Sequence, residues 1–241
     1  MIRWGLALMI LATAASADED EPGAFDYYVL SLSWTPTWCA LEGDARGSTQ
    51  CDPGQGYGFT LHGLWPQYET GWPSYCASTE RAPSRRMTAE MVDIMGSTGL
   101  AWHQWNKHGV CSGLSAEDYF EVSRAVYAQV ERPDLLRQHE RPVRLPAQII
   151  EEAFLEVNET LEPDMLTVTC SDGRVQEVRI CLTRGLEPRN CGADVVRDCT
   201  LQEALFSPMR RVGQLNPDKA PERGASPSHS PGYLGNKEAT I

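Results

Sequence analysis

Eight cysteines in a chain of 241 residues constrain the fold more than any other feature of this sequence. The number is even, and no two of the cysteines have the Cys-x-x-Cys spacing that is common in zinc sites, so structural zinc is the weaker alternative. We expect four disulfides formed in an oxidising compartment. Spacing alone leaves the partners open. The cysteines are Cys39, Cys51, Cys76, Cys111, Cys170, Cys181, Cys191 and Cys199.

The first residues have the pattern of a secretory signal peptide. Arg3 gives one positive charge, residues 4–12 form a short apolar run, and the small residues 15–17 precede an acidic stretch. The pattern predicts cleavage after Ala17 and export to the periplasm or the extracellular space. The apolar run is too short to span a bilayer, so we expect no membrane anchor.

Length and charge limit the remaining possibilities. The chain is long enough for one substantial core, which predicts a single domain over residues 18–212 and a monomer. Residues 213–241 are rich in Pro, Gly, Ser and charged residues and predict a disordered tail. The net charge of −12 argues against a protein that binds nucleic acid through overall positive charge. An enzyme with a small cationic pocket is still compatible with it.

The periodicity of apolar residues predicts strands at both ends of the domain and helices in the middle. We expect an α+β fold with a central antiparallel β-sheet and packed helices. In the second strand, alternation should place Thr60, His62 and Leu64 on one face, and Trp65-Pro66 should end the strand. The expected strands are 25–34, 59–64, 166–170 and 175–182, and the expected helices are one capped by Thr88 and stopped by Gly96 and Gly99, one around His103, one capped by Ser115, and one at 146–158.

The segment from Trp102 to Cys111 holds two of the five histidines, together with an amide and a lysine. On a helix, His103, Gln104, Lys107 and His108 fall within an arc of about 140°. Trp102 and Trp105 point elsewhere and can pack. The two histidines are five residues apart rather than four, and the lysine would repel a cation, which argues against a metal site.

A third histidine, His62, lies in the unusual run Leu61-His62-Gly63-Leu64-Trp65-Pro66. Burying three histidines and a lysine together costs several kcal/mol unless an anion offsets their charge. The set is therefore suited to proton transfer at a phosphate. His139 and His229 lack such neighbours, and we expect both at the surface.

These two segments resemble the active-site segments of the ribonuclease T2 family of secreted endoribonucleases. The run Ser33-Trp34-Thr35-Pro36-Thr37-Trp38-Cys39 is similar to the first strand of that family. The resemblance covers roughly residues 25–206 and implies the T2-like α+β fold. It also implies that the substrate is single-stranded RNA, which carries its own nucleophile, so that neither a metal nor another cofactor is needed and DNA is not cleaved.

The resemblance also implies roles for individual residues. His108 would be the general base for the 2′-hydroxyl, His62 the general acid for the leaving 5′-oxygen, and Lys107 would stabilise the phosphorane. His103 would bind the phosphate with Gln104 beside it. The products would be 2′,3′-cyclic phosphates and then 3′-phosphates.

Two further implications concern the base and the pH optimum. Trp65 and Gln67 resemble positions that contact the base on the 5′ side of the cut, although aromatic packing is an equal alternative, and broad base specificity is expected. The family usually has Glu where this chain has Gln104. Loss of that anion should lower the pKa values of the helix histidines and move the pH optimum downward.

The family pattern implies the disulfide partners: Cys76 with Cys111, and Cys170 with Cys199 around Cys181 with Cys191. Cys39 and Cys51 then remain for each other. Two other classes of function stay open, a non-catalytic RNA-binding protein and a metal-dependent phosphodiesterase. RNA incubated with the protein in excess EDTA separates all three.

Overall fold

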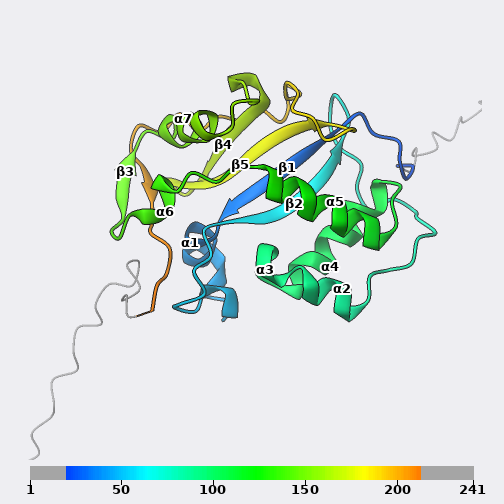
Figure 1. The fold of residues 1–241 in the computed structure, drawn as a ribbon, viewed down its shortest axis with the longest axis horizontal. Coiled ribbons are helices and arrows are strands. Elements are labelled where there is room, and N and C mark those ends of the chain that lie inside the picture. Colours follow the sequence, from blue (N-terminus) through cyan, green and yellow to red (C-terminus); the bar gives the residue numbers. More distant parts are fainter. Residues whose placement is uncertain (1–19, 213–241) are drawn as a thin grey trace, which may run out of the picture.

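The computed structural model describes residues 20–212, so the expected signal peptide and tail, with His229, lie outside the described residues. A six-stranded sheet crosses the middle of the molecule in the order β2-β1-β5-β6-β3, with β4 also paired to β5 (Figure 1). The pairs are antiparallel except β5 with β6, which is parallel. The expected α+β class is confirmed. The strands are β1 (Tyr27–Trp34), β2 (Phe59–Gln67), β3 (Val143–Leu145), β4 (Leu166–Ser171), β5 (Arg174–Thr183) and β6 (Ala204–Phe206).

The helices lie in two groups around this sheet. Helices α2 to α5 gather beside β2, and α7 packs against β4 (Figure 1). Within the described range, no helix is both long and apolar enough to cross a bilayer. The helices are α1 (Thr35–Trp38), α2 (Arg85–Glu90), α3 (Val92–Met95), α4 (Thr98–Lys107), α5 (Ala116–Gln129), α6 (Leu135–Gln138) and α7 (Gln148–Val157), with short 3-10 or π turns at Cys39–Gly43, Thr49–Cys51, Gly109–Cys111 and Pro163–Met165.

The two faces of the sheet carry different side chains, as alternation along a strand requires. On β1, Leu30 and Leu32 belong to the large apolar core that the helices cover. Ser31 and Ser33 alternate with them and lie on the opposite face. This second face is apolar only at one end, where Tyr27 joins a small cluster. The sheet therefore presents a polar surface on the side away from the main core.

Strand β2 is longer than the sequence predicted, because Pro66 does not end it. The strand continues to Gln67, and Pro66 pairs with Tyr28 of β1. Proline has no N–H to donate to a neighbouring strand, which excludes it from strand interiors but not from edges. Since β2 is the end strand in the sheet order, it accommodates the proline.

A bulge in β2 contradicts the predicted alternation. The pairing with β1 passes from Gly63 to Leu61 and leaves His62 as the extra residue. As a result, Leu64 turns into the main core with Leu61 instead of sharing a face with His62. The bulge aims the His62 side chain away from the core, where it keeps about a third of its surface exposed.

One predicted helix cap is wrong, whereas another is confirmed. Helix α2 is capped by Ser84, whose Oγ accepts the N–H of Met87, and Thr88 lies inside the helix. Ser84, four residues before Thr88, therefore caps the helix in place of the threonine. Gly96 ends α3 as expected, but Gly99 lies inside α4 and does not stop a helix. The expected cap of α5 is confirmed, since the Oγ of Ser115 accepts the N–H of Asp118 at 3.2 Å.

His139 is not simply a surface residue, in contrast to the expectation. It is half-buried and its ring stacks on Phe206 at 5.0 Å between centroids. Trp34 also stacks on Phe206, at 4.3 Å, and lies 6.3 Å from the His139 ring. The apolar neighbours come from strands distant in sequence, which a local pattern cannot reveal.

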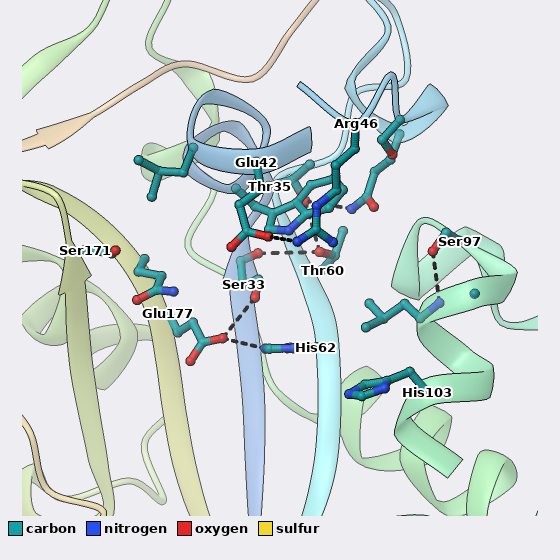
Figure 2. Close-up of a pocket in the computed structure, with 17 residues that line it drawn as sticks. Ser33, Thr35, Glu42, Arg46, Thr60, His62, Ser97, His103, Ser171 and Glu177 are labelled. Atoms are coloured by element: carbon teal, nitrogen blue, oxygen red, sulfur yellow. Dashed lines mark hydrogen bonds and ion pairs between the residues drawn. The ribbon is translucent and has the colours of Figure 1, made fainter. Parts of the chain in front are cut away.

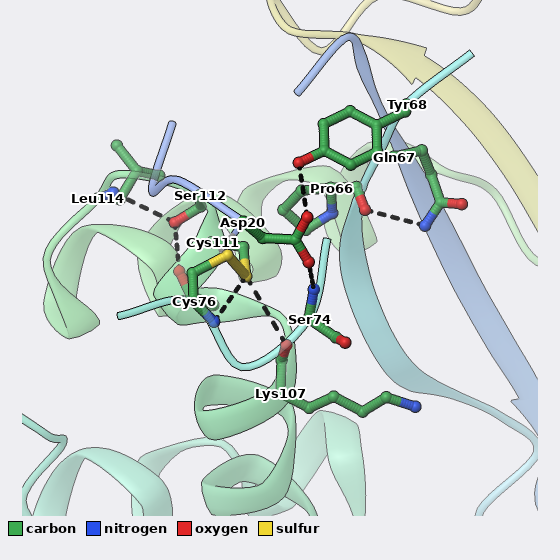
Figure 3. The surroundings of a disulfide bond; sticks show 11 residues. Asp20, Pro66, Gln67, Tyr68, Ser74, Cys76, Lys107, Cys111, Ser112 and Leu114 are labelled. Carbon is green, nitrogen blue, oxygen red and sulfur yellow. Dashed lines mark hydrogen bonds between the residues drawn. A yellow bond between two sulfur atoms is a disulfide. The ribbon is translucent and has the colours of Figure 1, made fainter. Parts of the chain in front are cut away.

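All four expected disulfides are present in the structure. Cys76–Cys111 joins the segment after β2 to the turn that follows α4 (Figure 3). The same segment is held by Asp20, whose carboxylate accepts the hydroxyl of Tyr68 and the N–H of Ser74, both at 3.0 Å. The other three pairs are Cys39–Cys51, Cys170–Cys199 and Cys181–Cys191.

Candidate active site

The residues singled out by the sequence meet beside β2, where α4 approaches the sheet. His62 from β2 and His103 from α4 lie opposite each other (Figure 2). These two histidines border two cavities, a groove of about 760 Å³ on one side and a cavity of about 330 Å³ on the other, which we call the histidine cavity. Every catalytic and base-binding residue expected from the sequence lines the histidine cavity: His62, Trp65, Gln67, His103, Gln104, Lys107 and His108.

At the end of α4, the side chains that line the cavity lie on a different side from those that pack in the core. Lys107 is the last helical residue and His108 is the C-cap, while Trp105 on the other side is only 1% exposed. A Cβ at Gly109 would come within 2.5 Å of the Trp105 ring, so glycine is required where the chain leaves the helix. Trp102, which was also expected to pack, is 44% exposed.

His108 is the most buried of the three histidines in the cavity, with 5% of its surface exposed. Its ring stacks on Trp65 at 5.2 Å between centroids. Burial, followed by the charges of Lys107, His62 and His103, lowers the pKa of His108 to about 3. The imidazole is therefore neutral at neutral pH and can accept a proton.

The rest of the cavity wall is rich in positive charge. Lys107, Arg179 and Arg197 line it from three separate segments, and Asp194 is the one carboxylate among the described residues that line it. Partial burial, Lys107 and His62 also lower the pKa of His103. A bound anion would reverse these effects, since opposite charge favours the protonated imidazole. The cavity is thus cationic within an acidic protein.

Gln104 occupies the position at which the resemblance leads one to expect a glutamate. The side chain is 2% exposed, and its Oε1 accepts the indole N–H of Trp65 at 2.7 Å. A Cβ at Gly63 would lie 2.2 Å from this oxygen, so the glycine of β2 makes room for the contact. Trp65 is therefore fixed between Gln104 and the ring of His108. Gln67 is buried, and its side-chain amide donates to the carbonyl of Pro66.

Strand β5 supplies two charged residues that the sequence did not single out. The Nδ1 of His62 lies 2.5 Å from Oε1 of Glu177, which is 2% exposed (Figure 2). Arg179 donates from Nε and Nη2 to the other carboxylate oxygen at 3.0 and 2.7 Å. Burial by itself would raise the pKa of Glu177, but His62 and Arg179 offset it and hold the pKa well below its usual range. The carboxylate is therefore ionised.

The sequence profile of the Ribonuclease T2 family matches residues 25–191 of this chain. The chain belongs to the ribonuclease T2 family. The match spans both histidine segments, Glu177 and Arg179, so it includes most of the residues that line the histidine cavity.

Curated relatives agree with this assignment. A ribonuclease of Aeromonas hydrophila is 38% identical over 141 residues, which cover 58% of this chain and 59% of the relative. A probable ribonuclease of Haemophilus influenzae is 29% identical over 121 residues, or 45% of this chain and 44% of the relative. The chain thus spans less than two thirds of the length of these relatives.

Solved structures of an RNase-related protein and of a ribonuclease have the same fold. An RNase-related protein from Calystegia sepium superposes with a TM-score of 0.57 at 20% identity and covers 78% of this chain and 98% of its own. RNase NT in complex with 5′-AMP gives a TM-score of 0.56 at 17% identity, over 76% of this chain and 98% of its own. At such identities the similarity establishes the fold.

The arrangement offers proton transfer on a bound anion. One buried neutral histidine, one histidine bonded to a carboxylate and one lysine face the same cavity. Between residues 20 and 212, no three His, Cys, Asp or Glu side chains are grouped so as to hold a metal ion. The sequence held a weak signal for Glu177 and Arg179. These two charged residues lie two positions apart in a strand that is otherwise largely apolar.

Proposed function

We propose that this protein is a metal-independent endoribonuclease that cleaves single-stranded RNA by transesterification. The observation that carries the proposal is the shared cavity, to which β2 contributes His62 and the end of α4 contributes Lys107 and His108. A scissile phosphate bound there would lie near both imidazoles, with an ammonium beside it. This is the arrangement that an acid–base reaction at phosphorus requires.

In the first step, neutral His108 takes the proton of the 2′-hydroxyl. The 2′-oxygen forms a bond to phosphorus, and the bond from phosphorus to the 5′-oxygen breaks. His62 gives a proton to the departing 5′-oxygen. Lys107 stabilises the charge of the phosphorane, and His103 binds a phosphate oxygen. Gln104 acts beside them by fixing Trp65.

In the second step, the two histidines exchange roles. His62, now neutral, takes a proton from water, whose oxygen attacks the 2′,3′-cyclic phosphate. His108 returns its proton to the 2′-oxygen as the bond from that oxygen to phosphorus breaks. The product is a 3′-phosphate, and both side chains return to their initial states.

We assign the base on the 5′ side of the cut to Trp65 and Gln67. Trp65 and Gln67 both line the histidine cavity, and an aromatic ring is a group on which a base can stack. Stacking is tolerant of base identity, so specificity is broad.

We further propose that residues 18–212 form the catalytic domain of an exported, monomeric enzyme. Four disulfides support an oxidising compartment, either the periplasm or the extracellular space. DNA is not a substrate, because it lacks the 2′-hydroxyl that attacks the phosphate.

The test is cleavage of RNA in excess EDTA. We expect fragments with 2′,3′-cyclic phosphate ends that convert slowly to 3′-phosphates, as resolved by mass spectrometry. A DNA strand with a single ribonucleotide should be cut only on the 3′ side of that ribonucleotide. No cleavage would support a binding protein, and cleavage only after metal is added would support a metal-dependent phosphodiesterase; either result contradicts the proposal.

The change Gln104→Glu should move the acidic limb of the kcat/KM profile to higher pH by about one unit. A carboxylate at this buried position favours the protonated form of His108 and raises its lowered pKa. Because the reaction needs neutral His108, activity then appears only at higher pH. Gln148→Glu, an exposed change of the same charge on α7, is the control. An unchanged profile for Gln104→Glu would count against the assignment of His108 as the base.

A further inference from the structure

We propose that Glu177 is a positioning residue for His62, which it orients and holds in the protonated form that donates to the leaving oxygen. This inference rests on the proposed function, in which His62 is the general acid. Glu177 does not contact the substrate in this scheme. It acts through the imidazole.

The contact fixes which nitrogen of His62 faces the substrate. Glu177 is ionised and can only accept, so Nδ1 of His62 carries the proton in the 2.5 Å contact. The other nitrogen, Nε2, is then the one available to the phosphate. A carboxylate that binds one nitrogen of an imidazole sets its tautomer and ring orientation, and it stabilises the imidazolium.

Glu177 is itself held rigidly. Its strand lies between β1 and β4, and the residue is directly opposite Ser33 in the pairing with β1. The hydroxyl of Ser33 donates to the same oxygen that His62 contacts, at 3.2 Å (Figure 2). Arg179 donates to the other oxygen. Both oxygens are therefore engaged, and the carboxylate cannot rotate away from His62 without losing these bonds.

His62 needs such a partner because β2 does not hold it firmly. It is the extra residue of the bulge, and its side chain is one third exposed. Among the described residues, the His62 ring contacts one aromatic ring, that of Trp65, which lies edge-on at 5.2 Å between centroids. In the described part of the chain, the Glu177 carboxylate is the one group that hydrogen-bonds to the His62 side chain.

The charges around His62 also support a role for the Glu177 carboxylate. From α4 and its end, His62 is faced by His103, Lys107 and His108, of which Lys107 supplies a positive charge. Arg179 from β5 adds another cation.

Three acidic residues line the two cavities among the described residues, and two of them are engaged elsewhere. Glu42 pairs with Arg46, and Asp194 accepts the N–H of Gly71. Glu177 alone is bonded to His62 and supplies the negative charge that an imidazolium needs there.

Glu177→Gln tests the assignment with two substrates that differ in the leaving group. A dinucleoside monophosphate loses a poor leaving group that needs protonation. A nucleoside 3′-(4-nitrophenyl phosphate) loses a phenolate that needs little. We expect kcat on the dinucleotide to fall by about 10²-fold or more, with KM nearly unchanged, and kcat on the aryl substrate to fall less than about tenfold. The alkaline limb of the dinucleotide profile should move to lower pH, because the protonated imidazole loses its ionised partner.

Three further variants make the result specific. Glu177→Asp keeps the charge but withdraws it from His62, and should give an intermediate loss on the dinucleotide alone. In a His62→Ala background, Glu177→Gln should have no further effect on either substrate. Glu187→Gln, a matched change at an exposed site just after β5, should leave both rates and the profile unchanged.

The outcomes separate this inference from the function on which it rests. Equal losses on the two substrates with an unmoved pH profile would mean that Glu177 is only structural, and the inference would be overturned. If Glu177→Gln does not fold, the Glu177→Asp comparison decides by the same criterion. Failure of the unaltered protein to cleave RNA in EDTA would instead overturn the proposed function.

Discussion

Replacing His108 by asparagine is expected to lower kcat on RNA by about 10³–10⁴-fold, the full contribution of a general base. The loss should be equally large on an aryl phosphodiester, because the 2′-hydroxyl must be deprotonated whatever group leaves. His62→Ala should instead lose most of its activity only on substrates with poor leaving groups. Initial rates of both variants on both substrates measure this difference.

The position of His108 makes this a clean substitution. It is the C-cap of α4, and its side chain is buried against Trp65 and not in the main core. Thermal unfolding of the variant should stay cooperative. A loss below about tenfold, or a loss confined to poor leaving groups, would assign the base to another residue.

The lowered pKa of His108 explains why one cavity can hold an acid and a base of the same residue type. Burial keeps His108 neutral, whereas His62 is exposed by a third and bonded to an ionised carboxylate. Two side chains of the same type are thus placed in different environments, one buried and one bonded to a carboxylate. The first step of the proposed reaction needs that difference.

Local sequence patterns were sufficient to predict the fold class and one wall of the site. The helical period brings His103, Gln104 and Lys107 to the same cavity because a helix is set by residues within four positions. The apolar periodicity likewise predicted the first strand, which the structure has as β1. These are features that a segment determines largely by itself.

The part that could not be predicted depends on pairing between distant strands. The bulge at His62 follows from the register of β2 on β1, and alternation along β2 alone gives the wrong face for Leu64. Glu177 lies 115 residues beyond His62 and reaches it only because β5 pairs with the other edge of β1. Its sequence neighbourhood indicates a strand and nothing about an acid–base role.

The second large effect is expected from removal of the Cys76–Cys111 disulfide by Cys76→Ala together with Cys111→Ala. A cross-link over 35 residues should contribute about 4 kcal/mol in the chain-entropy model. Denaturant unfolding should show a loss of this size. Removing Cys170–Cys199, which spans 29 residues, should cost nearly the same.

The two disulfides should differ in their effect on activity. Cys111 follows the end of α4 that carries Lys107 and His108, and one residue before Cys76 the N–H of Tyr75 donates to the carbonyl of Lys107 at 2.9 Å. Loss of the Cys76–Cys111 disulfide frees the backbone that carries Lys107 and His108. The kcat should therefore fall by about tenfold or more at temperatures where the variant is still folded. The Cys170–Cys199 variant has no such link to α4 and should keep its kcat under the same conditions. Equal activity in the two variants would mean that the hydrogen bonds around Asp20 and Tyr75 position α4 without help from the disulfide.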